Sequence, residues 1–132
     1  MQMTGEPEKV YRNKWEENPD FHMKYDVGDH SVVVTFSGET IAESSGAKFL
    51  LEADRTPVLY VPVADVRQDL LERTDTHSHC HWKGHCSYYS IKAGGKLSEN
   101  ALWAYEDPYP EAGFMKGYVS FHPDRVDEIT QS

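Results

Sequence analysis

The chain is short of basic residues. Its 132 residues include 13 Lys and Arg against 22 Asp and Glu, which gives a formal net charge of -9 with histidine neutral. Non-specific binding to nucleic acids depends on basic side chains that neutralise phosphates. The sequence therefore predicts no broad nucleic-acid-binding surface and no nucleic-acid partner.

The chain also lacks a long apolar run. No stretch approaches the roughly 20 consecutive apolar residues that a membrane-spanning helix needs. The first residues, 1–18, are polar and charged and contain no apolar segment of the kind found in secretory signals. These two absences predict a cytoplasmic protein without a membrane partner.

Cysteine is scarce as well. The two cysteines, Cys80 and Cys86, are too few for a disulfide framework, and a bond between them would close only a small loop. We therefore expect two free thiols.

The chain does contain enough apolar material for one core, with 39% hydrophobic and 12% aromatic residues. Its length fits one domain, since domains commonly have roughly 100–150 residues. We divide it into an N-terminal arm (1–18), a β domain (19–129) and a frayed tail (130–132). A helical turn is expected within 8–17, and Val10, Tyr11 and Trp15 either pack back onto the domain or belong to a partner-binding peptide.

Short runs of β-branched and aromatic residues, separated by turn residues, predict a mainly β protein with antiparallel strands in a sandwich or barrel. Val32, Val34 and Phe36 alternate with Val33 and Thr35 in the period of two expected for a strand, and Ser37-Gly38 then turns the chain. Prolines at 57 and 62 bound a further strand, because proline cannot donate a hydrogen bond within a sheet. The strands expected before the centre of the chain cover 32–36, 39–43, 47–51 and 58–61, and the last strand covers 118–121.

Gly94-Gly95 predicts a tight hairpin, because such a two-residue loop needs positive φ at both positions. Counting outward from this loop pairs Ala93 with Lys96, Tyr88 with Ala101 and Cys86 with Trp103. Since side chains alternate along a strand, Tyr88, Glu99, Trp103 and Tyr105 would share one face. This face is either a binding surface or a core face with a polar rim.

One helix is expected inside the domain, over 62–72. Proline suits the first turn of a helix, and Val63, Val66 and Leu70 fall at helical spacing. Arg67 then points away from the apolar stripe, either into solvent or toward a ligand. A closing helical turn is expected over 122–128. These make one or two short helices in an otherwise β fold.

The segment 74–89 is the densest in reactive groups, with both cysteines and four of the seven histidines. Zinc takes cysteine and histidine ligands. The candidate metal ligands are His77, His79, Cys80, His81, His85 and Cys86. Strand alternation places His77, His79 and His81 on the opposite side from Cys80, however, so we favour surface histidines over a metal site and predict no cofactor.

Several short motifs occur together in a particular order. They are Gly38-Glu39-Thr40-Ile41-Ala42-Glu43-Ser44, Tyr60-Val61-Pro62 with Asp65-Val66-Arg67, Thr76 with Cys80, Trp82-Lys83-Gly84 and Ser87-Tyr88, Trp103-Ala104-Tyr105 with Pro108, and Gly117-Tyr118-Val119-Ser120-Phe121. Over roughly 19–129, this pattern resembles the family called domain of unknown function 427 (DUF427). The resemblance implies a small β domain of the β-tent type, an arrangement of antiparallel sheets also seen in B-type methionine sulfoxide reductases.

The chain departs from the usual family sequence at some positions. The family usually has proline after the cysteine, where this chain has His81, whereas Cys80, Lys83 and Gly84 are shared. Structural zinc in β-tent proteins is held by paired Cys-x-x-Cys motifs, which this chain lacks. The family also carries a nucleotidyltransferase-like label, and that chemistry needs a Gly-Ser turn followed by an Asp-x-Asp pair to hold magnesium. Neither is present, so we set that label aside.

Three functions remain open. The first is binding of a small anionic or aromatic molecule, because Lys83 supplies a cation and the aromatic residues supply flat walls. The second is a cysteine-dependent enzyme that uses Cys80 with Lys83, possible because a nearby cation can activate a thiol as a nucleophile. The third is a Cys/His metal-binding or protein-interaction module. The sequence leaves open whether the protein is an enzyme and whether it forms a homo-oligomer. The predicted ligand-binding residues are Tyr60, Arg67, Cys80, Trp82, Lys83, Glu99 and Trp103.

Overall fold

The fold is mainly antiparallel β, as the sequence predicts. The computed structural model describes residues 14–132, and within them one sheet connects nine strands. The strands are β1 (Met23–Tyr25), β2 (His30–Phe36), β3 (Glu39–Glu52), β4 (Val58–Pro62), β5 (Leu71–Cys80), β6 (Gly84–Ala93), β7 (Lys96–Pro108), β8 (Tyr118–Phe121) and β9 (Glu128–Gln131).

The prediction of a helix over 62–72 is wrong. That segment forms two 3-10 turns separated by Val66 and Arg67, and Val66 makes an isolated bridge to Ala42 in β3. Arg67 N also donates a hydrogen bond to Ile41 O at 2.8 Å, so the backbone between the turns is used by the sheet. The apolar spacing that suggested a helix therefore comes from residues that pack on the aliphatic part of the core. The 3-10 turns of residues 14–132 are η2 (Lys14–Glu16), η3 (Val63–Asp65), η4 (Gln68–Leu70), η5 (Pro110–Met115) and η6 (Pro123–Arg125).

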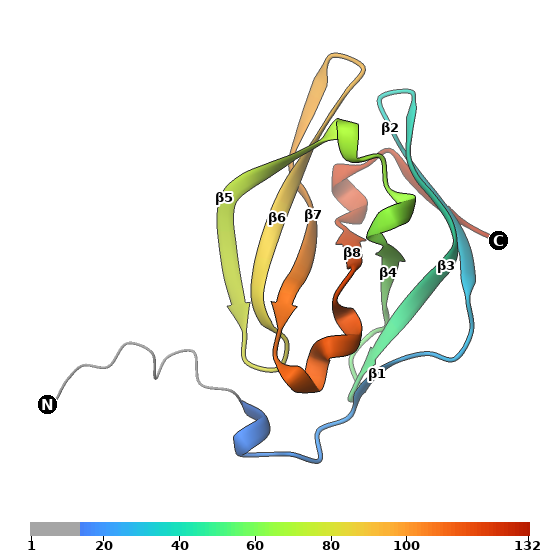
Figure 1. The fold of residues 1–132 in the computed structure, drawn as a ribbon. Helices are drawn as coiled ribbons and strands as arrows, with labels where there is room; N and C mark the ends of the chain where they lie inside the picture. The colour runs from blue at the N-terminus through green and yellow to red at the C-terminus, as the bar shows by residue number, and fades with distance from the viewer. Residues whose placement is uncertain (1–13) are drawn as a thin grey trace, which may run out of the picture.

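The sheet folds so that its two halves face each other. Its strands are ordered β5-β6-β7-β8-β4-β3-β2-β9, and β1 pairs with β3. In Figure 1, β5, β6 and β7 lie on one side of the molecule and β2 and β3 on the other, with β8 and β4 joining them. Strands that are distant in sequence therefore contribute side chains to one interior.

The β2–β3 hairpin forms where the sequence predicts it. Ser37 and Gly38 adopt positive φ in the turn, and Phe36 pairs with Glu39. The break expected at 44–46 is absent, however, because β3 continues through it with a change of register against β2. The Ser44 hydroxyl accepts a hydrogen bond from Gly46 N at 3.0 Å. A bulge thus replaces the predicted turn, and the two expected strands are one long strand.

The β6–β7 hairpin is confirmed at its turn, where Ala93 pairs with Lys96. Farther from the turn the expected register is wrong, because Tyr88 pairs with Trp103 rather than with Ala101. The shift occurs at Asn100, which has a φ of 51° and donates its backbone N–H to the Ser90 hydroxyl at 3.0 Å. This irregularity moves the pairing by two residues, so the predicted alternation of faces still holds from Tyr89 to Ser87. A second irregularity, between Ser87 and His85, moves the pairing by one more residue.

The core has two parts. The larger is aliphatic and includes the fully buried Val34, Ile41, Ile91 and Leu102. The second is rich in aromatic residues, and its buried members are Trp15, Met23, Leu50, Tyr60, Ala112 and Met115. Burying one large apolar side chain stabilises a fold by roughly 1.5–3 kcal/mol. The second part also borders the cavity described below.

Both ends of the described chain pack on the domain. Trp15 is buried and donates its indole N–H to Trp82 O at 2.7 Å, so its predicted packing is confirmed. The predicted positions of Val10 and Tyr11 fall outside the described residues. The tail predicted to fray over 130–132 instead pairs with β2, as in the Val33–Thr130 pair. That prediction was wrong because the partner strand lies about a hundred residues away in sequence.

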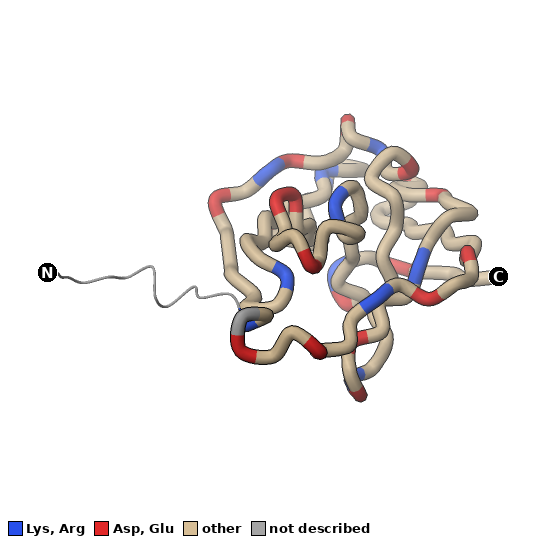
Figure 2. Tube along the Cα trace, turned by 60° about the horizontal axis from the view of Figure 1, so that its bottom comes forward, with Lys and Arg blue, Asp and Glu red and all other residues tan. Residues whose placement is uncertain are grey.

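Across residues 14–132, no helix has the length and apolar character needed to cross a membrane. Acidic and basic positions are interspersed along the trace in Figure 2.

Candidate functional site

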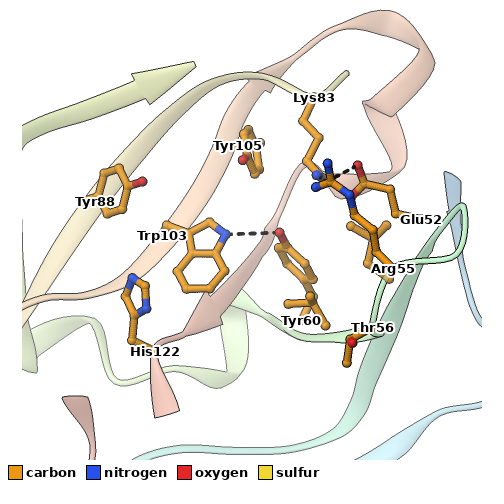
Figure 3. A pocket seen from close by; sticks show the side chains of 11 residues that line it. Glu52, Arg55, Thr56, Tyr60, Lys83, Tyr88, Trp103, Tyr105 and His122 are labelled. Carbon is orange, nitrogen blue, oxygen red and sulfur yellow. Dashed lines mark hydrogen bonds and ion pairs between the residues drawn. The ribbon is translucent and has the colours of Figure 1, made fainter. Parts of the chain in front are cut away.

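A cavity of about 280 Å³ opens beside the second part of the core. Its lining comes from β3, β4, β6, β7 and the loops next to them. The lining residues are Leu50, Glu52, Arg55, Thr56, Val58, Tyr60, Lys83, Tyr88, Trp103, Tyr105 and His122. In Figure 3, Lys83, Glu52 and Arg55 gather at one end, Tyr88 and His122 lie at the other, and Trp103 and Tyr60 lie between them.

The turn between β5 and β6 places Lys83 in this cavity. Gly84 has a φ of 114°, a conformation that L side chains rarely adopt, and a Cβ there would lie 3.1 Å from Tyr109 N. Tyr109 N in turn donates a hydrogen bond to Lys83 O at 3.0 Å, which ties the turn to the end of β7. The backbone of this turn therefore requires Gly84, and the turn places the Lys83 side chain at the cavity.

Lys83 forms a buried ion pair with Glu52 at the end of β3. The two atoms Lys83 Nζ and Glu52 Oε1 lie 2.7 Å apart, and the side chains are only 9% and 7% exposed. Charged groups are rarely buried unless they are paired, because removal from water is costly. This pair gives the cavity one polar end in otherwise aromatic surroundings.

The second oxygen of Glu52 is less well satisfied. Glu52 Oε2 is buried and has no hydrogen-bond partner among the described residues. The Arg55 guanidinium lies 3.8 Å from this oxygen, within ion-pair range but too far for a hydrogen bond. The Arg55 side chain is 70% exposed, so it lies at the mouth of the cavity.

Aromatic side chains form the rest of the wall. The Trp103 indole N–H donates to the Tyr60 hydroxyl at 3.2 Å, and the two rings meet edge to face with centroids 6.4 Å apart. Lys83 Nζ lies 5.9 Å from the centroid of Tyr105. Burial raises the pKa of both Tyr60 and Tyr105, which keeps these phenols neutral at physiological pH.

The structure brings together some of the predicted site residues and separates others. Tyr60, Lys83 and Trp103 line the cavity. Trp82 instead stacks on Phe21 with ring centroids 3.7 Å apart. Arg67 and Glu99 also lie outside the cavity. Arg67 is paired with Asp69 at 2.7 Å, and Glu99 is exposed on β7.

The two cysteines differ in their surroundings. Cys80 is partly exposed, and its Sγ lies 3.8 Å from Lys83 Nζ. Cys86 is only 1% exposed, and burial raises the pKa of its thiol. Both are free thiols, as the sequence predicts. Cys80 is thus the thiol that contacts the cation of the site.

The four histidines of the segment 74–89 lie on β5, on β6 and in the turn between them. His85 Nε2 lies 3.1 Å from His77 Nδ1, while His79 shares a hydrogen bond of 2.6 Å with the Tyr109 hydroxyl. Partial burial, with His81 and His85 nearby, lowers the pKa of His79. Over residues 14–132, no three His, Cys, Asp or Glu side chains form a group that could hold a metal ion.

The lining residues that were not predicted from the sequence include Glu52, Arg55 and His122. Glu52 lies two residues after the buried Leu50, so the same face of an extended strand carries both. The alternation of β3 could have revealed this, but the strand was expected to end at Leu51. No local signal connects Arg55 or His122 with Lys83, because the sheet brings them together from different parts of the chain.

Comparison with known proteins places the chain in a family. The family model described as a domain of unknown function (DUF427), labelled NTP_transf_9, matches residues 26–132. The chain therefore belongs to this family, as its motifs suggest. Among curated proteins, no match was found.

Proposed function

Because the family description assigns no activity, we propose from the geometry of the site that the protein binds a small molecule in the cavity between β3, β4, β6 and β7. The observation that carries this proposal is the buried Lys83–Glu52 pair at one end of an aromatic-walled cavity. Ligand sites commonly combine apolar and aromatic walls with a few polar groups that fix orientation. This cavity has that composition.

The ion pair favours a functional role over a purely structural one. A buried ion pair often contributes no more stability than well-packed apolar residues of the same volume. Here the pair borders open space and has Arg55 beside it, so its polar atoms can meet a ligand.

The size and walls of the cavity limit the ligand. Its volume of about 280 Å³ is near the lower end of the range for small-molecule sites. The rings of Tyr60, Trp103 and Tyr105 offer flat apolar surface to an aromatic group. Lys83, Glu52 and Arg55 form a charged end, so a polar group on the ligand is the other feature that the site favours.

NMR spectra of ¹⁵N-labelled protein test this proposal through the chemical shifts of the tryptophan indole N–H groups. Small aromatic acids, amides and amines are added in turn, and resonances are assigned with single Trp→Phe variants. We expect ligands to shift the Trp103 indole signal, because Trp103 lines the cavity, and to leave Trp15 in place, because its indole is bound to Trp82 O. Absence of any selective Trp103 shift across the set would contradict the proposal.

A second candidate function rests on a different contact. The 3.8 Å separation of Cys80 Sγ and Lys83 Nζ favours a cysteine-dependent reaction, since a neighbouring ammonium stabilises a thiolate nucleophile. Such an enzyme requires Cys80 to react faster in the folded protein than in the unfolded chain. Alkylation rates of Cys80 in the folded and the unfolded protein test this requirement.

A further inference from the structure

The two carboxylate oxygens of the buried Glu52 differ in their hydrogen bonding. Oε1 accepts a hydrogen bond from Lys83 at 2.7 Å, whereas Oε2 is buried and accepts none from the described residues. Glu52 is only 6% exposed and lines the cavity. A buried acceptor without a donor is unfavourable, so a ligand that supplies the donor gains affinity.

Resting on the small-molecule site proposed above, we propose that the preferred ligand is a flat ring carrying a neutral carboxamide. Its N–H donates to Glu52 Oε2, and its carbonyl oxygen accepts from the Arg55 guanidinium. The two protein groups lie 3.8 Å apart, side by side at one end of the cavity. A carboxamide also places its donor and its acceptor side by side on one carbon, so it can bridge the two.

The charges around Glu52 disfavour the two ionic alternatives. A carboxylate ligand would bring a second anion against the unpaired Oε2, and like charges repel strongly where water is excluded. A cationic ligand would meet Lys83 and Arg55, both of which lie within ion-pair distance of the same carboxylate. A neutral group that both donates and accepts avoids both repulsions.

The aromatic wall of the cavity favours an aromatic ring in the part of the ligand that does not carry the carboxamide. Tyr60 and Trp103 are fixed to each other by a hydrogen bond of 3.2 Å, and Tyr105 lies beside Lys83. Rings packed edge to face or offset against such walls are favourable. The inferred class is therefore a small aromatic carboxamide rather than an aliphatic one.

Matched amide and acid pairs test this inference. The probes are benzamide and benzoate, nicotinamide and nicotinate, and 2-naphthamide and 2-naphthoate, which differ within each pair only in the polar group. Dissociation constants are measured from the Trp103 indole shift at about pH 7, where the acids are ionised. We expect each amide to bind roughly tenfold or more tightly than its acid.

Two variants assign the preference to its source. Glu52→Gln keeps an oxygen for Lys83 but presents an amide N–H₂ in place of Oε2, so we expect the order to reverse in favour of the acids. Arg55→Ala removes a mostly exposed cation. It should weaken the acids more than the amides and so widen the amide preference. Thermal unfolding of each variant checks that the fold is retained.

The outcomes separate the two proposals. Tighter binding of the amides, with the reversal in Glu52→Gln, supports the carboxamide inference. Tighter binding of the acids at Trp103 overturns it but leaves the small-molecule site standing. Equal binding within pairs also overturns it, since Oε2 then plays no part in recognition. If no probe of either kind shifts Trp103, both proposals fail.

Discussion

Lys83 Nζ lies 2.7 Å from Glu52 Oε1, although the two residues are 31 positions apart and belong to different halves of the sheet. The turn that carries Lys83 follows β5, and Glu52 closes β3. Their contact joins the Cys80–Gly84 turn to the opposite strand. The same contact forms the polar end of the cavity, so the stability of the pair and the chemistry of the site are linked.

Removing one partner of this pair should be far more costly than removing both. Lys83→Ala leaves a buried carboxylate without its nearest cation, and we expect the free energy of unfolding to fall by about 3–5 kcal/mol. The double variant Lys83→Met with Glu52→Gln leaves neither charge and should recover most of that loss. Urea unfolding of Lys83→Ala and of the double variant measures this. Equal losses in Lys83→Ala and the double variant would show that the ion pair contributes little.

Gly84→Ala should disturb the turn that positions Lys83. The added Cβ would lie 3.1 Å from Tyr109 N, and the φ of 114° is strained for alanine. We expect a loss of about 1–3 kcal/mol in unfolding free energy. The matched control is Gly113→Ala, where a Cβ would meet nothing within 4 Å, with an expected change within about 0.5 kcal/mol. Similar effects at both glycines would contradict this description of the turn.

The two thiols should react at different rates with iodoacetamide in the folded protein. Cys86 is buried and its pKa is raised by burial, so little of it is thiolate at neutral pH. Because the thiolate is the nucleophile, we expect Cys80 to be alkylated first and Cys86 to follow only as the protein opens. Peptide mass spectrometry measures both rates, with the urea-unfolded chain as the control.

The Cys80 rate also tests the second candidate function. A rate well above that of the unfolded chain would support a cysteine-dependent enzyme, whereas an equal or slower rate would count against it. Labelling of Cys86 as fast as Cys80 in the folded state would contradict the burial described for Cys86.

Asp26 should contribute to stability in a pH-dependent way. Its pKa is lowered chiefly by the hydrogen bond with His30, at 2.7 Å, and further by the Phe49 backbone N–H. A carboxyl group with a lowered folded pKa stabilises the fold above its unfolded pKa, and this contribution is lost as pH falls through the folded value. We therefore expect Asp26→Asn to be destabilising at about pH 7, with the difference from wild type shrinking below about pH 4. Unfolding free energies across this range test it, and a difference independent of pH would be contrary to expectation.

The sequence predicted the elements that depend on local chemistry. Ser37-Gly38 and Gly94-Gly95 specify their turns through positive φ, and both hairpins form there. The bulge at Asn100 was not foreseen, because it depends on a hydrogen bond to Ser90 across the hairpin. The expected helix over 62–72 failed for a similar reason, since Val66 bridges to β3.

The site residues show the same contrast between what local sequence predicts and what tertiary contacts decide. Lys83, Tyr60 and Trp103 were predicted to bind a ligand and do line one cavity. Glu52, which gives the cavity its buried carboxylate, was missed because its meeting with Lys83 arises only when β3 folds beside the Cys80–Gly84 turn. Arg67 was selected for its charge, yet Asp69 and Glu39 engage it away from the cavity. Residue type alone selected the candidate groups, but the tertiary pairing decides which of them meet.

Native mass spectrometry gives the most direct test of the claim that the cavity binds a small molecule. Purified protein, alone and after incubation with the aromatic amides and acids, is compared with Trp103→Ala and with Trp82→Phe as a control outside the cavity. We predict a non-covalent mass increment in wild type and in Trp82→Phe that is lost in Trp103→Ala. Only the bare chain mass in every wild-type sample, or an increment unaffected by Trp103→Ala, would contradict the claim.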